Sequence, residues 1–171
     1  MARVAIAMSG GVDSSVAAAL LKEKGYEVIG LHMKLYRGPE NEIQNKSCCS
    51  IEETIDARLA CHRLGIPFYA LDYQQEFQET VIDYFIEGYI NGTTPNPCVM
   101  CNKKIKSSLL LKKAAELDCK HLATGHYARI CSNPYTGKKQ LSRPQDLRKD
   151  QTYFLHGIPS EELTRLLFPL S

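Results

Sequence analysis

The fold class follows from residues 3–15, which read RVAIAMSGGVDSS. A short apolar run leads into Gly10 and Gly11, and apolar residues at helical spacing then continue as far as Gly25. The stretch therefore predicts a strand, a glycine turn and a helix that begins directly after the turn.

The rest of the chain repeats this alternation of strands and helices. Further strands are expected at residues 27–32, 66–71 and 120–124, and the main helices at residues 50–65, 77–89 and 101–117. Strands separated by helices of this length form parallel sheets covered on both faces. Residues 127–130 and 140–143 then flank a turn rich in Asn, Pro and Gly, which predicts a β-hairpin. We therefore expect an α/β fold, an αβα sandwich with a parallel sheet and a small β-hairpin extension near the C-terminus.

The helix at residues 50–65 has a clear predicted start and a predicted face. Ser50 and Glu53 form a capping box. Ile51, Ile55 and Leu59 lie on one apolar face of that helix, the kind of face that helices bury.

Length and composition predict one globular domain. The chain has 171 residues, of which 44% are apolar and 23% charged, and this balance excludes disorder. It holds no apolar run of the ~18 residues that a membrane span needs, and its first residues do not resemble a signal peptide, so we expect a cytoplasmic protein with no membrane partner. Seven cysteines fit a reducing compartment, where thiols serve metal binding or catalysis.

The net charge of +2 combines two unlike halves. Residues 1–99 carry −5 and residues 100–171 carry +7. A basic half suggests a polyanionic partner, although chance clustering of surface lysines would give the same count.

The glycine turn at residues 9–14 is typical of an anion site. Two glycines let the backbone approach a bulky anion, and the helix that follows supplies N–H groups with a partial positive charge. The turn lacks the lysine of the common triphosphate loop and the Gly-x-Gly-x-x-Gly of dinucleotide sites. The alternative is a merely tight turn in which Asp13 caps the helix.

A second motif lies at residues 94–106, which read TPNPCVMCNKKIK. Its prolines predict a loop over residues 91–99, which puts Cys101 at or just before the start of the next helix. There the helix dipole and nearby lysines favour a thiolate, which could attack sulfur or carbon or ligate a soft metal. The alternatives are half of a structural zinc site or two idle thiols.

Together these motifs resemble a known family. The glycine turn resembles the pyrophosphate-binding loop of the PP-loop ATPases, which belong to the adenine nucleotide alpha-hydrolase-like fold and cleave ATP between its α and β phosphates. The cysteine motif resembles the catalytic loop of the tRNA-specific 2-thiouridylases. Four more blocks match that family in order, at residues 31–34, 123–129, 149–155 and 167–170.

The resemblance implies roles for individual residues. ATP, with Mg²⁺, would be held by Ala7, Met8, Ser9, Gly10, Gly11, Val12, Asp13 and Ser14, with Met33 and Gly125 beside the adenine and ribose. The flipped target base would meet Asn96, Pro97 and Cys98, and the tRNA would contact His126, Lys149, Asp150 and Gln151. The resemblance makes Cys101 the nucleophile, with Cys98 and Asp13 as the other catalytic candidates. On its own residues, His126 reads as a polar group satisfied at a strand end.

The resemblance also implies a reaction and its partners. ATP would adenylate the C2 oxygen of the wobble uridine in a tRNA anticodon loop, and sulfur from a cysteine persulfide would then displace AMP. A sulfur donor or relay protein is therefore expected. The family's second cysteine, central linker domain and C-terminal β-barrel have no counterpart in residues 1–171, which form the ATP-binding domain, so we expect ATP binding without full turnover.

Cys98 departs from the family pattern, because many members have Asp at this position. Cys98 and Cys101 with a third cysteine could hold an iron–sulfur cluster, and Cys48 and Cys49 are candidates for the third ligand. Two other functions stay open: an adenylating ligase or synthetase of the PP-loop type acting on a small molecule, and a nucleotide-binding module without catalysis.

Overall fold

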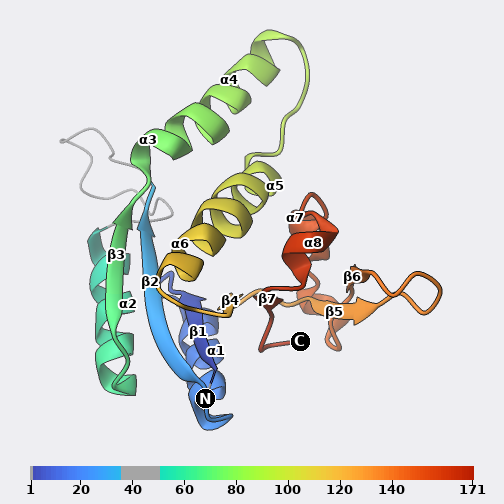
Figure 1. Cartoon of the computed structure of the whole chain (residues 1–171). Helices are drawn as coiled ribbons and strands as arrows, with labels where there is room; N and C mark the ends of the chain where they lie inside the picture. The colour runs from blue at the N-terminus through green and yellow to red at the C-terminus, as the bar shows by residue number, and fades with distance from the viewer. Residues whose placement is uncertain (1, 36–50) are drawn as a thin grey trace.

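A parallel sheet of five strands organises the molecule (Figure 1). The computed structural model describes residues 2–35 and 51–171, so Ser50 of the predicted capping box lies outside it. Across the sheet the order is β3 (Phe68–Asp72), β2 (Glu27–Lys34), β1 (Arg3–Ala7), β4 (His121–Ala123) and β7 (Leu166–Leu167), with every neighbouring pair parallel. After β1 the chain continues into β2 on one side of β1, and it later returns as β4 on the other side of β1. The carboxyl end of β1 is therefore the topological switch point, where α/β sheets bind ligands.

Each face of the sheet carries its own apolar cluster, because successive strand residues point to opposite faces. Val4 and Ile6 pack with helices α1 (Val12–Glu23) and α2 (Ile51–Leu64), whereas Ala5 packs with the helices of the other face. All three of these strand residues are fully buried. The parallel sheet with helices on both faces confirms the predicted αβα sandwich.

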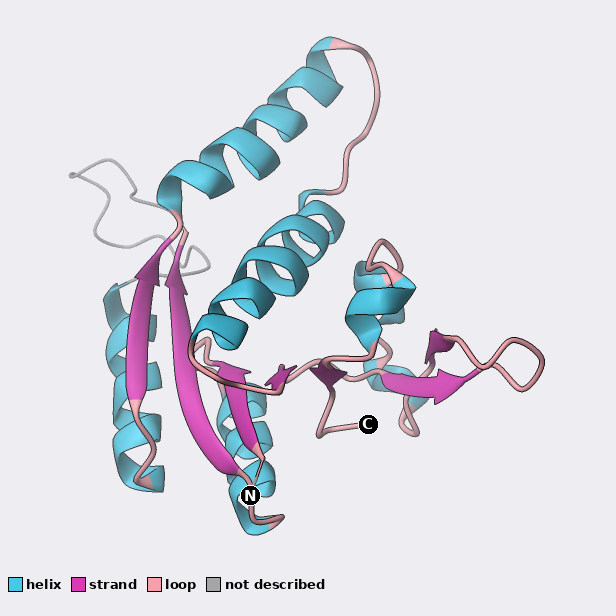
Figure 2. Cartoon of the chain, viewed as in Figure 1, coloured by secondary structure: helices cyan, strands magenta, loops and turns pink. Residues whose placement is uncertain are grey.

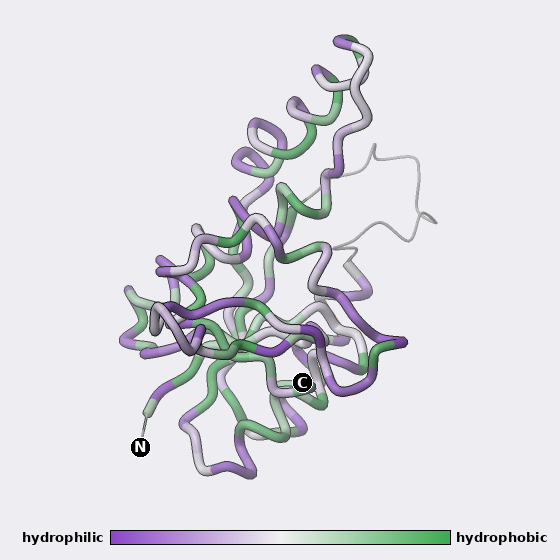
Figure 3. The backbone as a smooth tube through the Cα atoms, turned by 90° about the vertical axis from the view of Figure 1, so that its right-hand side faces the viewer, coloured by the Kyte–Doolittle hydropathy of each residue, from purple (hydrophilic) through white to green (hydrophobic). Residues whose placement is uncertain are grey.

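Two long helical segments follow on this side: the first begins at the carboxyl end of β3 and projects past the sheet, and the second packs over the second face (Figure 2). The first runs through α3 (Gln74–Phe77), the π-helical η1 (Gln78–Ile82) and α4 (Asp83–Ile90), and the second through α5 (Pro97–Met100), the π-helical η2 (Cys101–Leu109) and α6 (Leu110–Glu116). The helix that projects farthest carries both hydrophilic and hydrophobic stretches (Figure 3). None of the described helices has the length and apolar character to cross a membrane.

The predicted hairpin is confirmed. Strands β5 (Arg129–Ser132) and β6 (Lys139–Ser142) pair antiparallel, and the turn between them uses Gly137 at a φ of +68°. The 3₁₀ turn η3 (Leu147–Lys149) and the short helices α7 (Thr152–Leu155) and α8 (Ser160–Leu163) then lead into β7. Sequence patterns did not predict β7, because two residues carry no periodicity.

The buried face of α2 differs from the predicted one. Ile55 and Leu59 are 52% and 49% exposed, while Ala57 and Cys61 are fully buried. A Cβ at Gly30 in β2 would collide with the Cys61 sulfur, so this helix lies very close to the sheet. Small side chains fit that narrow layer, and the larger apolar residues are left on the outer side.

The helical segment that runs from α5 through α6, called the cysteine helix below, begins earlier than predicted. Asn96 caps it, since its Oδ1 accepts hydrogen bonds from the N–H groups of Cys98 (3.1 Å) and Val99 (3.3 Å). Pro97 occupies the first helical position, where its missing N–H costs nothing. The loop therefore ends at residue 96, and Cys101 lies about one turn inside the helix.

Candidate functional site

The glycine turn is shaped by close contact with α2. Gly10 has a φ of +85°, and a Cβ there would lie 2.5 Å from the carbonyl oxygen of Glu53. Gly11 is the N-cap of α1, and among the described residues no side chain caps this helix start. The first N–H groups of α1 are thus left for an anion in front of the turn.

Serine hydroxyls fix the shape of the turn. The Ser14 hydroxyl donates to the Gly11 carbonyl (3.0 Å), and the Ser9 N–H donates to the Ser14 oxygen (3.3 Å). The Gly11 N–H donates to the Ser9 hydroxyl (3.3 Å). Ser14 is buried and serves the turn itself, whereas Ser9, Val12 and Asp13 are exposed.

The carboxyl end of β4 lies directly against this turn, and Gly125, which the resemblance places beside the adenine and ribose, follows that strand. A Cβ at Gly125 would lie 2.8 Å from the backbone nitrogen of Ser14, so only glycine fits. Met33, the other residue predicted beside the adenine, is buried in β2. Its neighbour His32, to which the sequence assigned no role, joins β1 to α2: Nδ1 bonds the Met8 carbonyl (2.8 Å) and Nε2 the Thr54 hydroxyl (2.9 Å).

Tyr127 connects the turn to a distant segment. Its hydroxyl donates to Asp13 Oδ1 at 3.1 Å, and this hydrogen bond raises the pKa of the Tyr127 phenol. Its backbone N–H donates to Gln151 Oε1 (2.9 Å), and the Gln151 N–H donates to its carbonyl (3.1 Å). The Lys149 ammonium lies 5.8 Å from the Tyr127 ring centroid. The sequence motif at residues 123–129 contains Tyr127, but only the fold shows its contact with Asp13.

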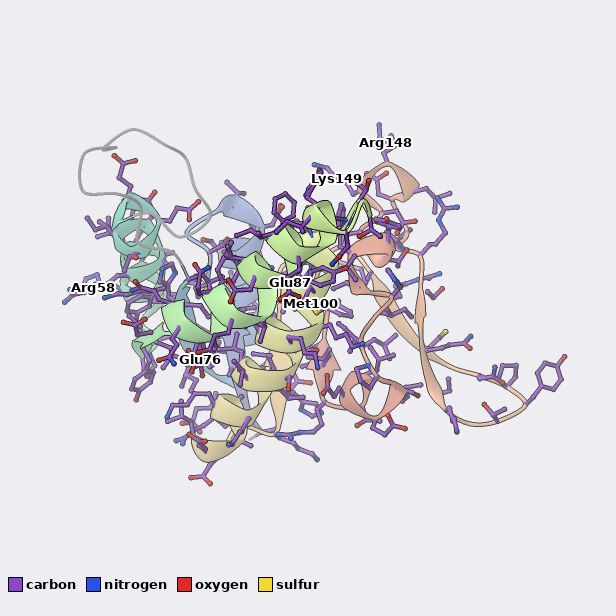
Figure 4. All side chains as sticks on the ribbon, turned by 90° about the horizontal axis from the view of Figure 1, so that it is seen from above. Arg58, Glu76, Glu87, Met100, Arg148 and Lys149 are labelled. Carbon is purple, nitrogen blue, oxygen red and sulfur yellow. The ribbon has the colours of Figure 1, made fainter. Side chains whose placement is uncertain are left out.

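Four residues were predicted to touch tRNA, and the three at residues 149–151 differ in what they present. Asp150 accepts from the Thr152 N–H (3.0 Å) and hydroxyl (2.7 Å) and from Arg143 Nε (2.6 Å), which together lower the pKa of its carboxyl to about 2. Asp150 and Gln151 hold the segment in place, and Lys149 is exposed (Figure 4).

His126 is partly buried, and its side chain packs against neighbouring residues. Its Nδ1 bonds the Thr124 hydroxyl (2.8 Å), and its ring meets the edge of Phe168 at a centroid distance of 6.4 Å. Burial, with a smaller contribution from the nearby Lys106 ammonium, lowers the pKa of the His126 imidazole to about 3.

This pKa predicts a stability that falls in acid. An unfolded histidine titrates near pH 6.5, so between about pH 6.5 and pH 3 the unfolded chain binds a proton that the folded chain excludes. Acidification therefore favours unfolding, and the His126 contribution lowers the free energy of unfolding by about 1.4 kcal/mol from pH 7.5 to 5.5. Urea titrations at the two pH values check this, with His126→Asn as the variant that loses the difference. An equal pH effect in both proteins would contradict the assignment.

The cysteine helix presents Cys98 and partly covers Cys101. Cys98 is exposed in the first turn, and Cys101 packs against the apolar cluster of the second face. The next residue, Asn102, is buried and donates from Nδ2 to the Phe154 carbonyl (3.1 Å), which ties this helix to α7. Because the helix begins at Pro97, the dipole of its first turn acts on Cys98 more directly than on Cys101, contrary to expectation.

The iron–sulfur hypothesis gains no third ligand here. Within residues 2–35 and 51–171, no three His, Cys, Asp or Glu side chains gather in a group that could hold a metal ion. Cys48 and Cys49 lie outside the described residues.

Comparisons with known proteins agree with this geometry. A family model, the tRNA methyl transferase HUP domain, matches residues 2–171. The tRNA-specific 2-thiouridylase MnmA of Symbiobacterium thermophilum is 52% identical over 174 residues, covering 98% of this chain and 44% of that protein. MnmA of Chloroflexus aurantiacus is 52% identical over 170 residues, covering 99% and 47%. The chain thus spans about half the length of the curated relatives it matches.

One solved structure supports the fold alone. It is described as a predicted subunit of tRNA methyltransferase from Methanocaldococcus jannaschii, and it superposes with a TM-score of 0.55 at 17% identity, covering 99% of this chain and 68% of that one. The family model spans nearly the whole sequence, and the relatives align over the same span. The chain therefore belongs to the family of the tRNA methyl transferase HUP domain and is a relative of the tRNA-specific 2-thiouridylases.

Proposed function

We propose that this chain carries out the ATP-dependent step of tRNA 2-thiolation and that its glycine turn binds the ATP. ATP adenylates the C2 oxygen of the wobble uridine and releases pyrophosphate. The terminal sulfur of a persulfide then attacks C2 and AMP leaves. The Cys101 thiolate attacks the inner sulfur of the persulfide, the sulfur–sulfur bond breaks, 2-thiouridine is released, and a disulfide forms that a thiol reductant later reopens. The supporting observation is that three features meet at the start of α1. They are the glycine turn without side chains, the end of β4, and Tyr127, which is bonded to the segment of residues 149–151.

The donors of the turn suit a polyphosphate. Gly10 leaves space where a side chain would stand, the uncapped N–H groups of α1 face an anion, and Asp13 offers a carboxylate beside them. Without a lysine in the turn, these N–H groups hold the two phosphates that leave. Asp13 is the residue that would hold Mg²⁺, which supplies charge neutralisation on those phosphates when bound.

The cysteine helix faces the acceptor in this proposal. Pro97 and the exposed Cys98 meet the flipped uridine, while the Asn96 side chain keeps the helix start in place through its two hydrogen bonds. Cys101 is the nucleophile that cleaves the sulfur–sulfur bond of the persulfide and so releases 2-thiouridine. The persulfide comes from a cysteine desulfurase or relay protein in the cytoplasm.

The test is an incubation of tRNA lacking 2-thiouridine with ATP, Mg²⁺ and a sulfide donor, followed by mass spectrometry of the nucleosides. We expect AMP and pyrophosphate in amounts that depend on tRNA, together with 2-thiouridine when sulfide is present, because sulfide attacks C2 directly and replaces the persulfide on the family's second cysteine. Release of ADP and phosphate would overturn the adenylation step. Pyrophosphate release that ignores tRNA would favour the small-molecule ligase.

Tyr127→Phe tests the hydroxyl that positions Asp13. The backbone of Tyr127 keeps its two bonds to Gln151, so the fold is unchanged, but the Asp13 carboxylate loses its partner. We expect MgATP to bind about threefold to tenfold more weakly, as titration calorimetry will measure. The matched control is Tyr135→Phe at the 95% exposed hairpin tip. Equal affinities in both variants would refute the positioning role.

A further inference from the structure

A groove lies between strand β6 and the short helices α7 and α8. Its lining includes no residue of the glycine turn or of the cysteine helix. Figure 1 shows these three elements side by side. The groove has a volume of about 630 Å³ and opens widely to solvent. Its lining includes Leu141, Ile158 and Leu163 together with Lys139, Tyr153 and His156. That volume is in the range of pockets that hold organic ligands.

Aromatic rings stand exposed along this groove. Tyr153 is 63% exposed, and its ring centroid lies 5.7 Å from that of His156 and 5.5 Å from that of Phe154. His156 Nδ1 donates to the Tyr153 carbonyl (2.6 Å), which fixes the imidazole and leaves Nε2 to meet a ligand. Within the described residues the Tyr153 hydroxyl makes no hydrogen bond. Exposed rings of this kind are surfaces on which nucleic-acid bases stack.

Strand β6 and the segments that flank it carry positive charge, whereas α8 on the other side of the groove carries Glu161 and Glu162. Residues 129–150 contain six Lys or Arg and two Asp, a net charge of +4. Both acids are already paired, Asp146 with Arg148 (3.1 Å) and Asp150 with Arg143 (2.6 Å). Lys139 bonds only the neutral Ser132 hydroxyl (3.0 Å) among the described side chains, so its charge is available to a phosphate. Arg148 also extends outward from η3 beside Lys149 (Figure 4).

We propose that this groove binds one unpaired nucleotide of the RNA substrate, with its base on the Tyr153 ring and its phosphate near Lys139. The inference rests on the proposed function, because it assigns the groove to the same RNA. The groove begins at Thr152, directly after the segment that holds Tyr127, so a strand that passes Lys149 reaches it next. A wide opening lets a polymer enter and leave, which a free nucleotide does not need.

The experiment measures binding of fluorescein-labelled tRNA anticodon stem–loop RNA to the full chain by anisotropy. Tyr153→Ala is expected to weaken binding about tenfold, since stacking of one base on an aromatic ring contributes on the order of 1–3 kcal/mol. Tyr153→Phe keeps the ring and is expected to bind within about twofold of the unaltered chain. Tyr135→Ala removes an equally exposed tyrosine outside the groove and is expected to change nothing.

The outcomes separate this inference from the proposed function. Unchanged RNA binding in Tyr153→Ala, or an equal loss in Tyr135→Ala, would overturn the groove while tRNA-dependent pyrophosphate release continues to support thiolation. Loss of that pyrophosphate release in the unaltered chain would instead overturn the proposed function. Binding of free uridine monophosphate as tightly as RNA, or self-association that Tyr153→Ala abolishes, would assign the groove to another occupant and overturn the inference.

Discussion

Gly10→Ala is expected to abolish nucleotide binding and to destabilise the fold. The new Cβ would lie 2.5 Å from the Glu53 carbonyl oxygen, and the residue would have to keep a φ of +85°. Left-handed strain and overpacking each cost about 1–3 kcal/mol, so the free energy of unfolding falls by roughly 2–6 kcal/mol. Movement of α1 away from α2 also turns its N–H groups from the phosphates, and two lost charge-assisted hydrogen bonds weaken ATP binding at least about 100-fold.

Two glycine variants separate strain from collision. Gly25→Ala has the same unfavourable backbone, at a φ of +80°, but meets no atom within 4 Å, so it loses stability without losing ATP affinity. Gly11→Ala has an ordinary φ of −78°, and its nearest contact is the Ser9 hydroxyl oxygen at 3.4 Å, so it is tolerated. Urea unfolding and MgATP calorimetry on all three variants make the comparison. ATP affinity in Gly10→Ala equal to that in Gly25→Ala would refute the role of the turn.

Cys101→Ser is expected to stop sulfur transfer while adenylation continues. A serine hydroxyl stays protonated where a thiol ionises. With a persulfide donor the variant therefore cannot cleave the sulfur–sulfur bond, and it forms 2-thiouridine about 1,000-fold more slowly, or not at all. The glycine turn lies on other elements and keeps its contacts, so tRNA-dependent pyrophosphate release persists. Mass spectrometry of nucleosides and a pyrophosphate assay report the two steps separately.

Other cysteines serve as matched controls for that experiment. Cys131→Ser removes a partly exposed thiol on the hairpin and is expected to be silent. Cys98→Asp introduces the residue common in the family and is expected to retain thiolation if position 98 only contacts the base. Full thiolation by Cys101→Ser would remove this residue from the reaction.

The sequence predicted the layered fold well, because apolar runs and helical spacing are local signals. The same locality explains its errors. Asn96 and Pro97 together start a helix at a place where two prolines suggested only a loop. Ile55 and Leu59 have the right spacing for a buried face, but the width of the layer under Gly30 favours Ala57 and Cys61 instead.

The site was predictable only in part for the same reason. The glycine turn was proposed from its residue types and Gly125 from the family resemblance, and the fold brings the two together. The bond from Tyr127 to Asp13 joins residues 114 positions apart, and no local pattern encodes it. Likewise, only the folded chain shows that the side chains of Asp150 and Gln151 accept hydrogen bonds from within the molecule.

The two apolar clusters on opposite faces of the sheet imply that the two layers can unfold locally and independently of each other. The glycine turn lies next to the apolar cluster formed with α1 and α2. The cysteine helix packs in the cluster on the other face of the sheet. Partial opening of one layer can therefore expose its amides to deuterium while the other stays protected. Substitutions in a lineage can therefore repack the helices around Cys101 while the glycine turn keeps its contacts with α2.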